Sequence, residues 1–497
     1  WETSSGYNRN DASTVAGGAL CNSVSLTSIN HAEKKSKLSV NFNQSKTIAE
    51  WRNYINNSGN WKGKNANPAY NNLSVDYSGG NCADITFPIT AGGSINHLNE
   101  VNKWNGSSSS DWFDCSNWDD NMVPNQQSRV IIDNSAANNP IIDNNSSNAA
   151  YYQSKARVKS LIISNGAQVT LANAIILEVS DSLILNDLPT SLVSDVSNTI
   201  RFVQNGTIES NQNSINLTSK LHLAEGVELN LNQNLSTLSD ILVEENSTLN
   251  INGIDLSTNG AIEINGTLNL SDDAGLIQST GSPNPIGTGN VNITRLQADY
   301  NIGENVLNHW SSPIKNNTIG ASNSAIYGTH HFRYPGGEDD NGDYIYIGET
   351  TMNPCIGYSA YGASSGDFSG SITQLNNGNF TIDLAAIAEK DNDPDEYEFY
   401  LMGNPYPSAI SAQSFLMENA VNNDEIYGTI FVFSQVNGYG AYNRETDNIS
   451  INVIGTSDPN LLEQSSFSVN ADQFNIASGQ GFFIVANEDN DSNHDLV

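Results

Sequence analysis

Three loops rich in Asp, Glu and Asn carry the residues of this sequence that are best suited to chemistry. In two of them the oxygen-bearing side chains occupy alternate positions, at Asp339, Asn341 and Asp343, and at Asp391, Asp393 and Asp395. The third loop runs from Glu488 to Asp491. Alternate residues of an extended segment lie on one side of the chain, and Ca²⁺ binds roughly six to eight hard oxygen atoms. We therefore expect Ca²⁺ as a cofactor of these loops, the alternative being solvated turns.

Neither alternating loop is an EF-hand. At the sixth position, where an EF-hand has Gly, the two loops have Tyr344 and Glu396. At the twelfth position, where it has Glu, they have Thr350 and Met402. A Ca²⁺ site in either loop would therefore use another geometry.

Arrangements typical of catalysis are absent from the sequence. No zinc-protease, nucleophile-elbow or P-loop motif occurs. His330 and His331 are adjacent, and adjacent strand residues point to opposite faces, so they would not chelate one ion together. The four cysteines form no C-x-x-C motif. They predict either a disulfide between Cys21 and Cys82 or four independent core residues, and we expect a protein without catalytic activity.

The charge balance excludes several kinds of partner. The chain has 54 acidic and 20 basic residues, a formal net charge of −34. Such a surface repels nucleic acid and the anionic face of a membrane. No apolar run reaches the length of a membrane-spanning helix, about 18 residues. The sequence begins at Trp1 and has no signal peptide, so we expect it to be a processed part of a longer protein.

A repeat of about 20 residues marks the middle of the chain. Turn-and-strand units begin at Gly166, Gly206, Gly226, Ser247 and Gly266, and apolar and polar residues alternate within each unit. A fixed period with one apolar face predicts a parallel β-helix over residues 156–296. Asparagines recur at matching positions and are expected to stack as ladders, at Asn230, Asn232, Asn250, Asn252, Asn265 and Asn269.

The rest of the chain also predicts β-structure, so the expected fold class is all-β. Residues 1–100 resemble part of a β-sandwich, with strands at Leu38–Phe42 and Ala83–Thr90. Residues 101–155 hold three tryptophans and predict a cap for the solenoid end. Residues 297–497 predict a β-sandwich or jelly-roll-like domain. Helical periodicity is confined to Ile48–Tyr54 and Ala409–Ala420.

Three further motifs follow the solenoid: W-S-S-P at 310–313, G-N-P-Y-P-S at 403–408 and S-G-Q-G-F-F at 478–483. The two prolines of the second motif fix the backbone, and either X-Pro bond is a candidate for the cis form. We interpret the second and third motifs as fold determinants rather than sites.

With the W-N-G-S-S-S-S-D-W-F-D-C-S-N-W-D-D-N-M-V-P segment at 104–124, these motifs resemble large secreted surface proteins of Bacteroidota. The resemblance covers about three-quarters of the chain and leaves out residues 1–100. It implies export by the type IX secretion route, a location on the cell surface, and roles in adhesion, motility or matrix. Partners would then be other surface-protein subunits or an extracellular polysaccharide. No C-terminal sorting domain is visible before Val497.

The expected function is a structural or adhesive module, which forms a stalk or a filament. The alternative is a carbohydrate-active protein, either a sugar-binding module or a β-helix lyase or hydrolase. Its sugar-stacking candidates are Trp104, Trp112, Trp118 and Trp310, for which a core role is the competing interpretation. A pocket on the side of the solenoid with clustered acidic and basic groups would favour this alternative.

Overall fold

The structure is a computed structural model of residues 1–497. It describes residues 101–119, 123–126, 128–152, 154–186, 191–271, 274–279, 281–296, 307–320, 324–334, 344–363, 365–384, 399–434, 438–443, 448–450, 475–487 and 495–496. Before residue 100 it describes two antiparallel pairs, β1 (Asn30–His31) with β2 (Ser36–Lys37) and β3 (Lys46–Thr47) with β4 (Thr86–Phe87). The predicted strand Leu38–Phe42 and helix Ile48–Tyr54 lie outside the described residues. The β-sandwich expected for residues 1–100 stays a prediction.

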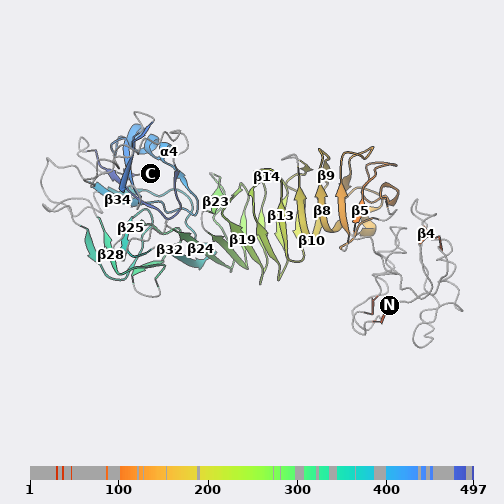
Figure 1. Cartoon of the computed structure of the whole chain (residues 1–497), viewed down its shortest axis with the longest axis horizontal. Helices are drawn as coiled ribbons and strands as arrows, with labels where there is room; N and C mark the ends of the chain where they lie inside the picture. Colours follow the sequence, from red (N-terminus) through yellow and green to blue (C-terminus); the bar gives the residue numbers. More distant parts are fainter. Residues whose placement is uncertain are drawn as a thin grey trace, which may run out of the picture. The chain divides into compact units, whose positions relative to one another are not determined.

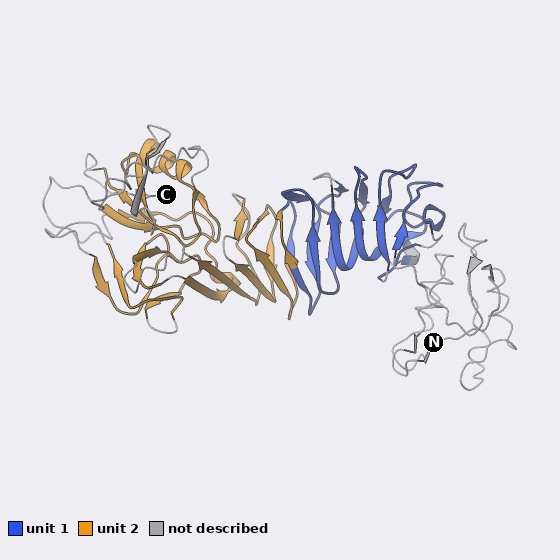
Figure 2. Ribbon diagram, viewed as in Figure 1, with its two compact units in different colours: residues 1–229, 235–241 blue, residues 230–234, 242–497 orange. Residues whose placement is uncertain are grey.

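The chain divides into two compact units, drawn in different colours in Figure 2. Unit 1 comprises Trp1–Leu229 and Leu235–Ile241, and unit 2 comprises Asn230–Asn234 and Leu242–Val497. The predicted β-solenoid is confirmed, and the division between the units falls within it. Each unit is therefore described by itself.

Parallel strands build the solenoid part of unit 1, where the strands of one rung lie beside those of the next (Figure 1). They are β5 (Val101–Lys103), β6 (Arg129–Ile132), β7 (Ile141–Asp143), β8 (Lys155–Ile163), β9 (Val169–Ala172), β10 (Ile176–Leu185), β11 (Leu192–Val193), β12 (Thr199–Phe202), β13 (Gly206–Glu209), β14 (Ser214–Leu217), β15 (Lys220–Leu223), β16 (Glu228–Leu231) and β17 (Asn234–Thr237). Strands β8 and β10 each bend at a corner and contribute to two faces of the solenoid. The short helices η4 (Cys115–Asn117) and η5 (Ala149–Tyr152) lie in the connections.

In unit 2 the same pattern continues through β18 (Ile241–Val243), β19 (Thr248–Asn252), β20 (Asp255–Thr258), β21 (Ile262–Ile264), β22 (Thr267–Ser271), β23 (Gly275–Gln278) and β24 (Asn290–Leu296). Corresponding strands β12, β15, β18 and β21 begin at Thr199, Lys220, Ile241 and Ile262. The rung is therefore about 21 residues long, close to the predicted 20.

Aliphatic side chains fill the interior because each strand turns every second residue inward. On one face of unit 1, Val130, Leu161 and Leu183 occupy the same register position in successive rungs and are fully buried. In unit 2, Leu249, Leu268 and Val291 form the equivalent column. Because aliphatic side chains stack at one register position in successive rungs, a short repeat can bury a continuous core.

Several small sheets follow the solenoid in unit 2. The strands are β25 (Leu307–Trp310), β26 (Thr318–Gly320), β27 (Ile326–Tyr327), β28 (His330–Arg333), β29 (Ile345–Ile347), β30 (Thr350–Thr351), β31 (Tyr358–Tyr361), β32 (Ser365–Ser371), β33 (Ile382–Asp383), β34 (Phe399–Gly403), β35 (Ile410–Ser411), β36 (Thr429–Ser434), β37 (Gly438–Asn443), β38 (Asn448–Ser450), β39 (Asn475–Ile476), β40 (Gly481–Val485) and β41 (Asp495–Leu496). Two sheets have the orders β25-β31-β28-β29 and β34-β40-β36-β37-β38. The sandwich or jelly-roll-like arrangement of residues 297–497 stays a prediction.

The last rung of the solenoid is covered within unit 2. Strand β32 pairs antiparallel with β24 along seven residue pairs, from Asn290 with Ser371 to Leu296 with Ser365. The edge of β24 is thereby occupied by the same chain, which removes an open edge that would otherwise be available to another protein.

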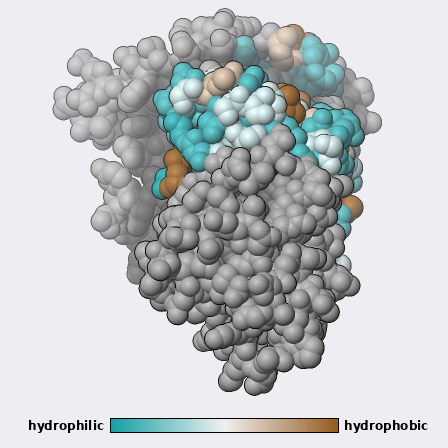
Figure 3. Space-filling model, turned by 90° about the vertical axis from the view of Figure 1, so that its right-hand side faces the viewer, coloured by the Kyte–Doolittle hydropathy of each residue, from teal (hydrophilic) through white to brown (hydrophobic). Residues whose placement is uncertain are grey.

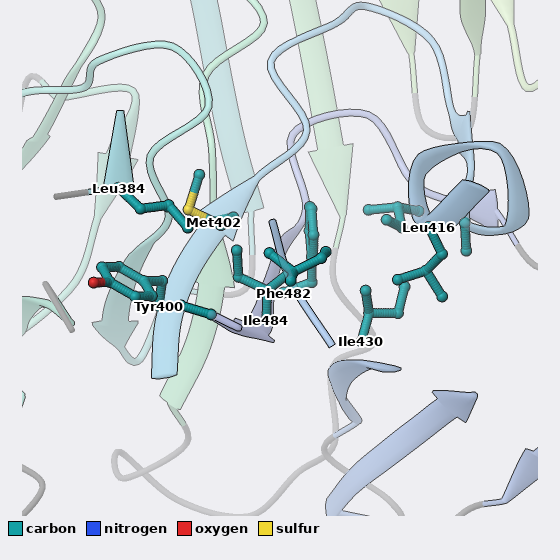
Figure 4. Close-up of a cluster of buried hydrophobic side chains, with 11 residues drawn as sticks. Leu384, Tyr400, Met402, Leu416, Ile430, Phe482 and Ile484 are labelled. Atoms are coloured by element: carbon teal, nitrogen blue, oxygen red, sulfur yellow. The ribbon is translucent and has the colours of Figure 1, made fainter. Parts of the chain in front are cut away.

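A separate hydrophobic core lies under the five-stranded sheet (Figure 4). It consists of Leu384, Tyr400, Met402, Ala412, Leu416, Ile426, Ile430, Ile476, Phe482, Ile484 and Ala486. The predicted helix Ala409–Ala420 is confirmed in this region as α4 (Ala412–Leu416), which continues as the π-helix η7 (Met417–Asn422). The helix η6 (Ile372–Gln374) follows β32. No helix of the described residues is long and apolar enough to span a membrane.

Candidate functional site

The predicted calcium ligands cannot be placed. Asp339, Asn341, Asp343, Asp391, Asp393 and Asp395 all lie outside the described residues, as does the loop from Glu488 to Asp491. Within the described ranges no group of His, Cys, Asp and Glu side chains is arranged to hold a metal ion. The Ca²⁺ sites therefore stay predictions.

The tryptophans proposed for sugar stacking are buried. Trp104, Trp112 and Trp118 are 0% exposed and Trp310 is 1% exposed. No sugar ring reaches a side chain without solvent access, so the stacking hypothesis is wrong for all four. The described surface visible in Figure 3 is mostly hydrophilic.

Three of these tryptophans fill the first described rung. The ring of Trp118 lies edge-on to both others, with centroid distances of 4.9 Å to Trp104 and 4.6 Å to Trp112. The indole N–H of Trp104 donates to the carbonyl oxygen of Asn138 (2.7 Å), and that of Trp118 donates to the carbonyl of Trp112 (2.9 Å). This packing makes the cluster a structural part of the solenoid, in agreement with the competing core interpretation.

The two cysteines of the described residues differ in oxidation state. Cys115 is disulfide-bonded, so the interpretation of four independent cysteines is wrong. Cys355 is free, and burial raises the pKa of its thiol to about 12. Cys21 and Cys82 lie outside the described residues.

A buried carboxylate on β10 holds three cations on the side of the solenoid. Glu178 is 3% exposed and accepts from Lys155 (2.8 Å), Arg157 (3.0 Å) and Arg201 (3.3 Å). Strand register places Arg157 and Arg201 on either side of Glu178. Burial raises the pKa of Glu178, but the hydrogen bond from Lys155 and the three positive charges outweigh this effect, so the pKa lies below its ordinary value. The cluster satisfies its own charges and is structural.

A hollow of about 240 Å³ lies on the neighbouring face of unit 1. We call it the serine hollow, and its lining residues are Arg129, Lys159, Ser160, Asp181, Ser182 and Ile184. It holds both acidic and basic groups on the side of the solenoid. A pocket with these groups on the side of the solenoid favours a carbohydrate-active protein.

The hollow follows from side-chain size in two outward columns. Arg129, Ser160 and Ser182 share one register position in three successive rungs, and Ile162 and Ile184 share the next outward position. Two short serines beside a column of isoleucines leave space between the longer side chains. The hollow also lies at the corner of β10, where Gly206 of the next rung allows the backbones to approach closely. A Cβ atom on Gly206 would lie 2.0 Å from the carbonyl oxygen of Asp181.

The charged groups of the serine hollow are unpaired within the described part of the chain. Arg129, Lys159 and Asp181 form no ion pair and no side-chain hydrogen bond there. Elsewhere in that part, Lys103 pairs with Asp133, and Lys220 pairs with Asp240. Two unpaired cations that line one hollow are notable in a chain with a formal charge of −34.

An aromatic face occupies one side of the β25-β31-β28-β29 sheet in unit 2. We define it by His330, Phe332, Tyr346 and Tyr361. Phe332 contacts Tyr346 and Tyr361 edge-on, with centroid distances of 5.9 and 5.7 Å, and His330 lies 6.2 Å from Tyr346. Tyr346 is 61% exposed. His331 is buried on the opposite side of the strand, which confirms that the two adjacent histidines do not face one site.

The three motifs that follow the solenoid meet at one place in unit 2. Asn404 is fully buried, and its side-chain amide donates to the carbonyls of Ser408 (2.8 Å), Ile476 (3.0 Å) and Ala477 (3.1 Å). The backbone of Ser311 donates to Gly479 (2.7 Å). A Cβ atom on Gly403 would lie 2.3 Å from that of Ser311, so only glycine fits there. None of the described residues has a cis peptide bond, so the prolines of the second motif are trans.

This meeting point also reaches the solenoid. The backbone N–H of Leu276 donates to the carbonyl of Pro407 (3.0 Å), and the guanidinium of Arg295 donates to the same carbonyl (3.5 Å) and to that of Ala274 (2.7 Å). Arg295 is 6% exposed. The motifs thus act as fold determinants that join the last rungs to the small sheets.

The chain matches the model of a family described as a domain of unknown function (DUF8693), over residues 103–225 and 224–497. The chain belongs to this family. The matched ranges include the tryptophan cluster, the solenoid, the serine hollow, the aromatic face and the three motifs. No curated protein and no solved structure matches the chain. The family description assigns no activity.

Proposed function

We propose that this chain is a non-enzymatic structural or adhesive module of a bacterial cell-surface protein, in which the solenoid serves as a spacer. The observation that supports this best is the pairing of β24 with β32, because it covers the last rung with protein of the same chain. A spacer needs a regular stack with protected edges, and rungs add length without a new globular core. The covered edge favours a stalk over a filament built by strand pairing at that end.

The likeness to surface proteins of Bacteroidota supports the extracellular part of this proposal. On that basis we infer export by the type IX secretion route and partners among other surface-protein subunits or extracellular polysaccharides. The predicted Ca²⁺ loops fit the same setting.

Imaging of the native protein tests the proposal. Antibody labelling and electron tomography of intact cells are expected to show the antigen outside the outer envelope, on extended projections. Label confined to the cytoplasm, or purified full-length protein in compact particles, would contradict the spacer function.

The second candidate function is sugar binding, and the aromatic face favours it. Exposed aromatic rings present an apolar surface together with polar edges, which suits the faces of sugar rings. His330 and Tyr346 supply such rings on one side of a sheet, and Phe332 supports both from below.

We predict that Tyr346→Ala weakens binding to neutral polysaccharides about fivefold, because an aromatic ring packed against the face of a sugar ring contributes on the order of 1 kcal/mol. Tyr327→Ala is the matched control, since Tyr327 is 62% exposed on β27 and makes no ring contact in the described part of the chain. Affinity electrophoresis in gels that contain xylan, glucan or mannan measures the effect. Equal retardation of both variants would exclude the aromatic face.

A further inference from the structure

We propose that the serine hollow binds the sugar-acid unit of an acidic polysaccharide, with the sugar carboxylate held by Arg129 and Lys159. This inference rests on the sugar-binding candidate function and names a ligand class for a different face of the molecule. It uses the hollow of about 240 Å³ and the residues that line it.

The positive groups select an anion. Arg129 and Lys159 are exposed, unpaired within the described residues, and both line the hollow. A guanidinium group binds a carboxylate through two parallel hydrogen bonds, and an ammonium group adds a compact charge. Because the chain has a formal charge of −34, cations without acidic partners indicate a part of the surface that attracts an anionic ligand.

The other lining residues select a sugar rather than a bare anion. Ser160 and Ser182 offer hydroxyl groups, and Asp181 offers a carboxylate that accepts from sugar hydroxyls. Ile184 offers an apolar wall for the face of the ring. A free phosphate or sulfate ion has no apolar face that would pack against Ile184. The negative charge of Asp181 also repels a dianion.

Size restricts the ligand to about one sugar ring. The volume lies below the roughly 300–1,000 Å³ that is typical of sites for drug-sized molecules. The hollow is open to solvent, so a ring bound in it can be part of a longer chain. An internal unit of a polysaccharide therefore fits better than a large branched ligand.

The test compares acidic and neutral sugars of equal length on the full chain. Titration calorimetry with trigalacturonate is expected to show binding that weakens as salt rises, since the contact is partly ionic. Neutral galactotriose is expected to bind at least about tenfold more weakly at this site.

Three variants locate the site. Arg129→Gln combined with Lys159→Gln is expected to reduce trigalacturonate affinity at least about tenfold. Ser182→Leu fills the hollow without changing its charge, and the same loss is expected. Lys315→Gln is the control, because Lys315 is an exposed, unpaired cation of the described residues outside the hollow. Circular dichroism confirms that each variant is folded.

The outcomes separate this inference from the broader function. Equal affinity for both trisaccharides, or affinity unchanged by both the Arg129→Gln/Lys159→Gln double variant and Ser182→Leu, overturns the sugar-acid site and leaves sugar binding by the aromatic face intact. Full competition by inorganic sulfate or phosphate also overturns it, because the site then recognises only charge. Absence of binding to any acidic or neutral glycan overturns both proposals.

Discussion

His309 on β25 shows how burial of one residue couples the fold to pH. It is 3% exposed, its Nδ1 lies 2.7 Å from the hydroxyl of Ser359, and the ring of Phe483 packs edge-on against it at 5.4 Å. Burial lowers the pKa of His309 to about 3. The imidazole is therefore neutral in the folded protein over most of the accessible pH range.

The pKa of His309 predicts acid destabilisation of unit 2. In the unfolded chain its pKa returns to about 6.5, so the unfolded state binds more protons between pH 6.5 and 3. The contribution of neutral His309 to the free energy of unfolding is fully present above this window. It is lost as pH falls through the window, by about 2 kcal/mol between pH 6.5 and 4.5. We expect His309→Gln to flatten this dependence in urea unfolding curves measured at each pH. A variant with an unchanged slope would assign the effect to other groups.

Exposure of single residues was the part of the candidate site that sequence could not predict. Trp104, Trp112 and Trp118 are buried in a rung and were wrong as sugar-stacking groups, because spacing among Ser and Asp does not tell which side of a rung a ring occupies. The sequence does indicate that Tyr346 lies on one face of a strand, because Tyr344 and Tyr346 alternate with aliphatic residues.

At the scale of elements, the asparagine column on β16, β19, β22 and β24 forms a ladder within unit 2. The side-chain amide of Asn250 donates to Asn230 (2.9 Å), that of Asn269 donates to Asn250 (2.8 Å), and that of Asn292 donates to Asn269 (2.9 Å). The predicted ladder was confirmed for Asn230, Asn250 and Asn269. Asn252 and Asn265 bond instead to Ser271 and Glu263, and Asn232 is exposed outside the ladder.

We predict that Asn250→Ala destabilises unit 2 by about 1–3 kcal/mol, because it removes two hydrogen bonds and leaves two partly buried amides unsatisfied. Asn292→Ala removes one bond at the exposed end of the ladder, and a smaller loss is expected. Hydrogen exchange of β19 and β22 measures the local effect, which nearest-neighbour stacking confines to adjacent rungs. Equal protection in both variants would show that the ladder contributes no stability.

Periodicity explains why the solenoid was predictable and the serine hollow was not. Each rung from β12 to β23 repeats at nearly constant spacing, so the alternation alone reveals the core. Arg129, Ser160 and Ser182 belong to earlier rungs whose connections differ in length. Their common register becomes visible only when the strands are paired. Asn292 was missed for the same reason, since an insertion before β24 shifts it out of phase.

At the scale of the whole molecule, the formal charge of −34 predicts a response to divalent cations. If the loops at Asp339–Asp343 and Asp391–Asp395 bind Ca²⁺, its removal exposes carboxylates to mutual repulsion and lowers stability. We expect excess chelator to lower the melting temperature by several degrees, and Ca²⁺ to restore it.

Controls distinguish specific binding from charge screening. Mg²⁺ at the same ionic strength is expected to restore less of the melting temperature, because Mg²⁺ requires a stricter octahedral geometry. Asp339→Asn with Asp343→Asn, and separately Asp391→Asn with Asp393→Asn, are expected to reduce the Ca²⁺ response. A melting temperature that is unchanged by chelator would exclude the metal sites.

The asparagine ladder also bears on how such a gene changes over generations. Every internal amide receives one hydrogen bond and gives one, so a rung meets the same neighbour above and below. Duplication of the coding segment between Asn250 and Asn269, which lie 19 residues apart, inserts another amide in register. Recombination can thus lengthen the stack by about 4.8 Å at a time without a new core. Related genes are expected to differ by whole rungs.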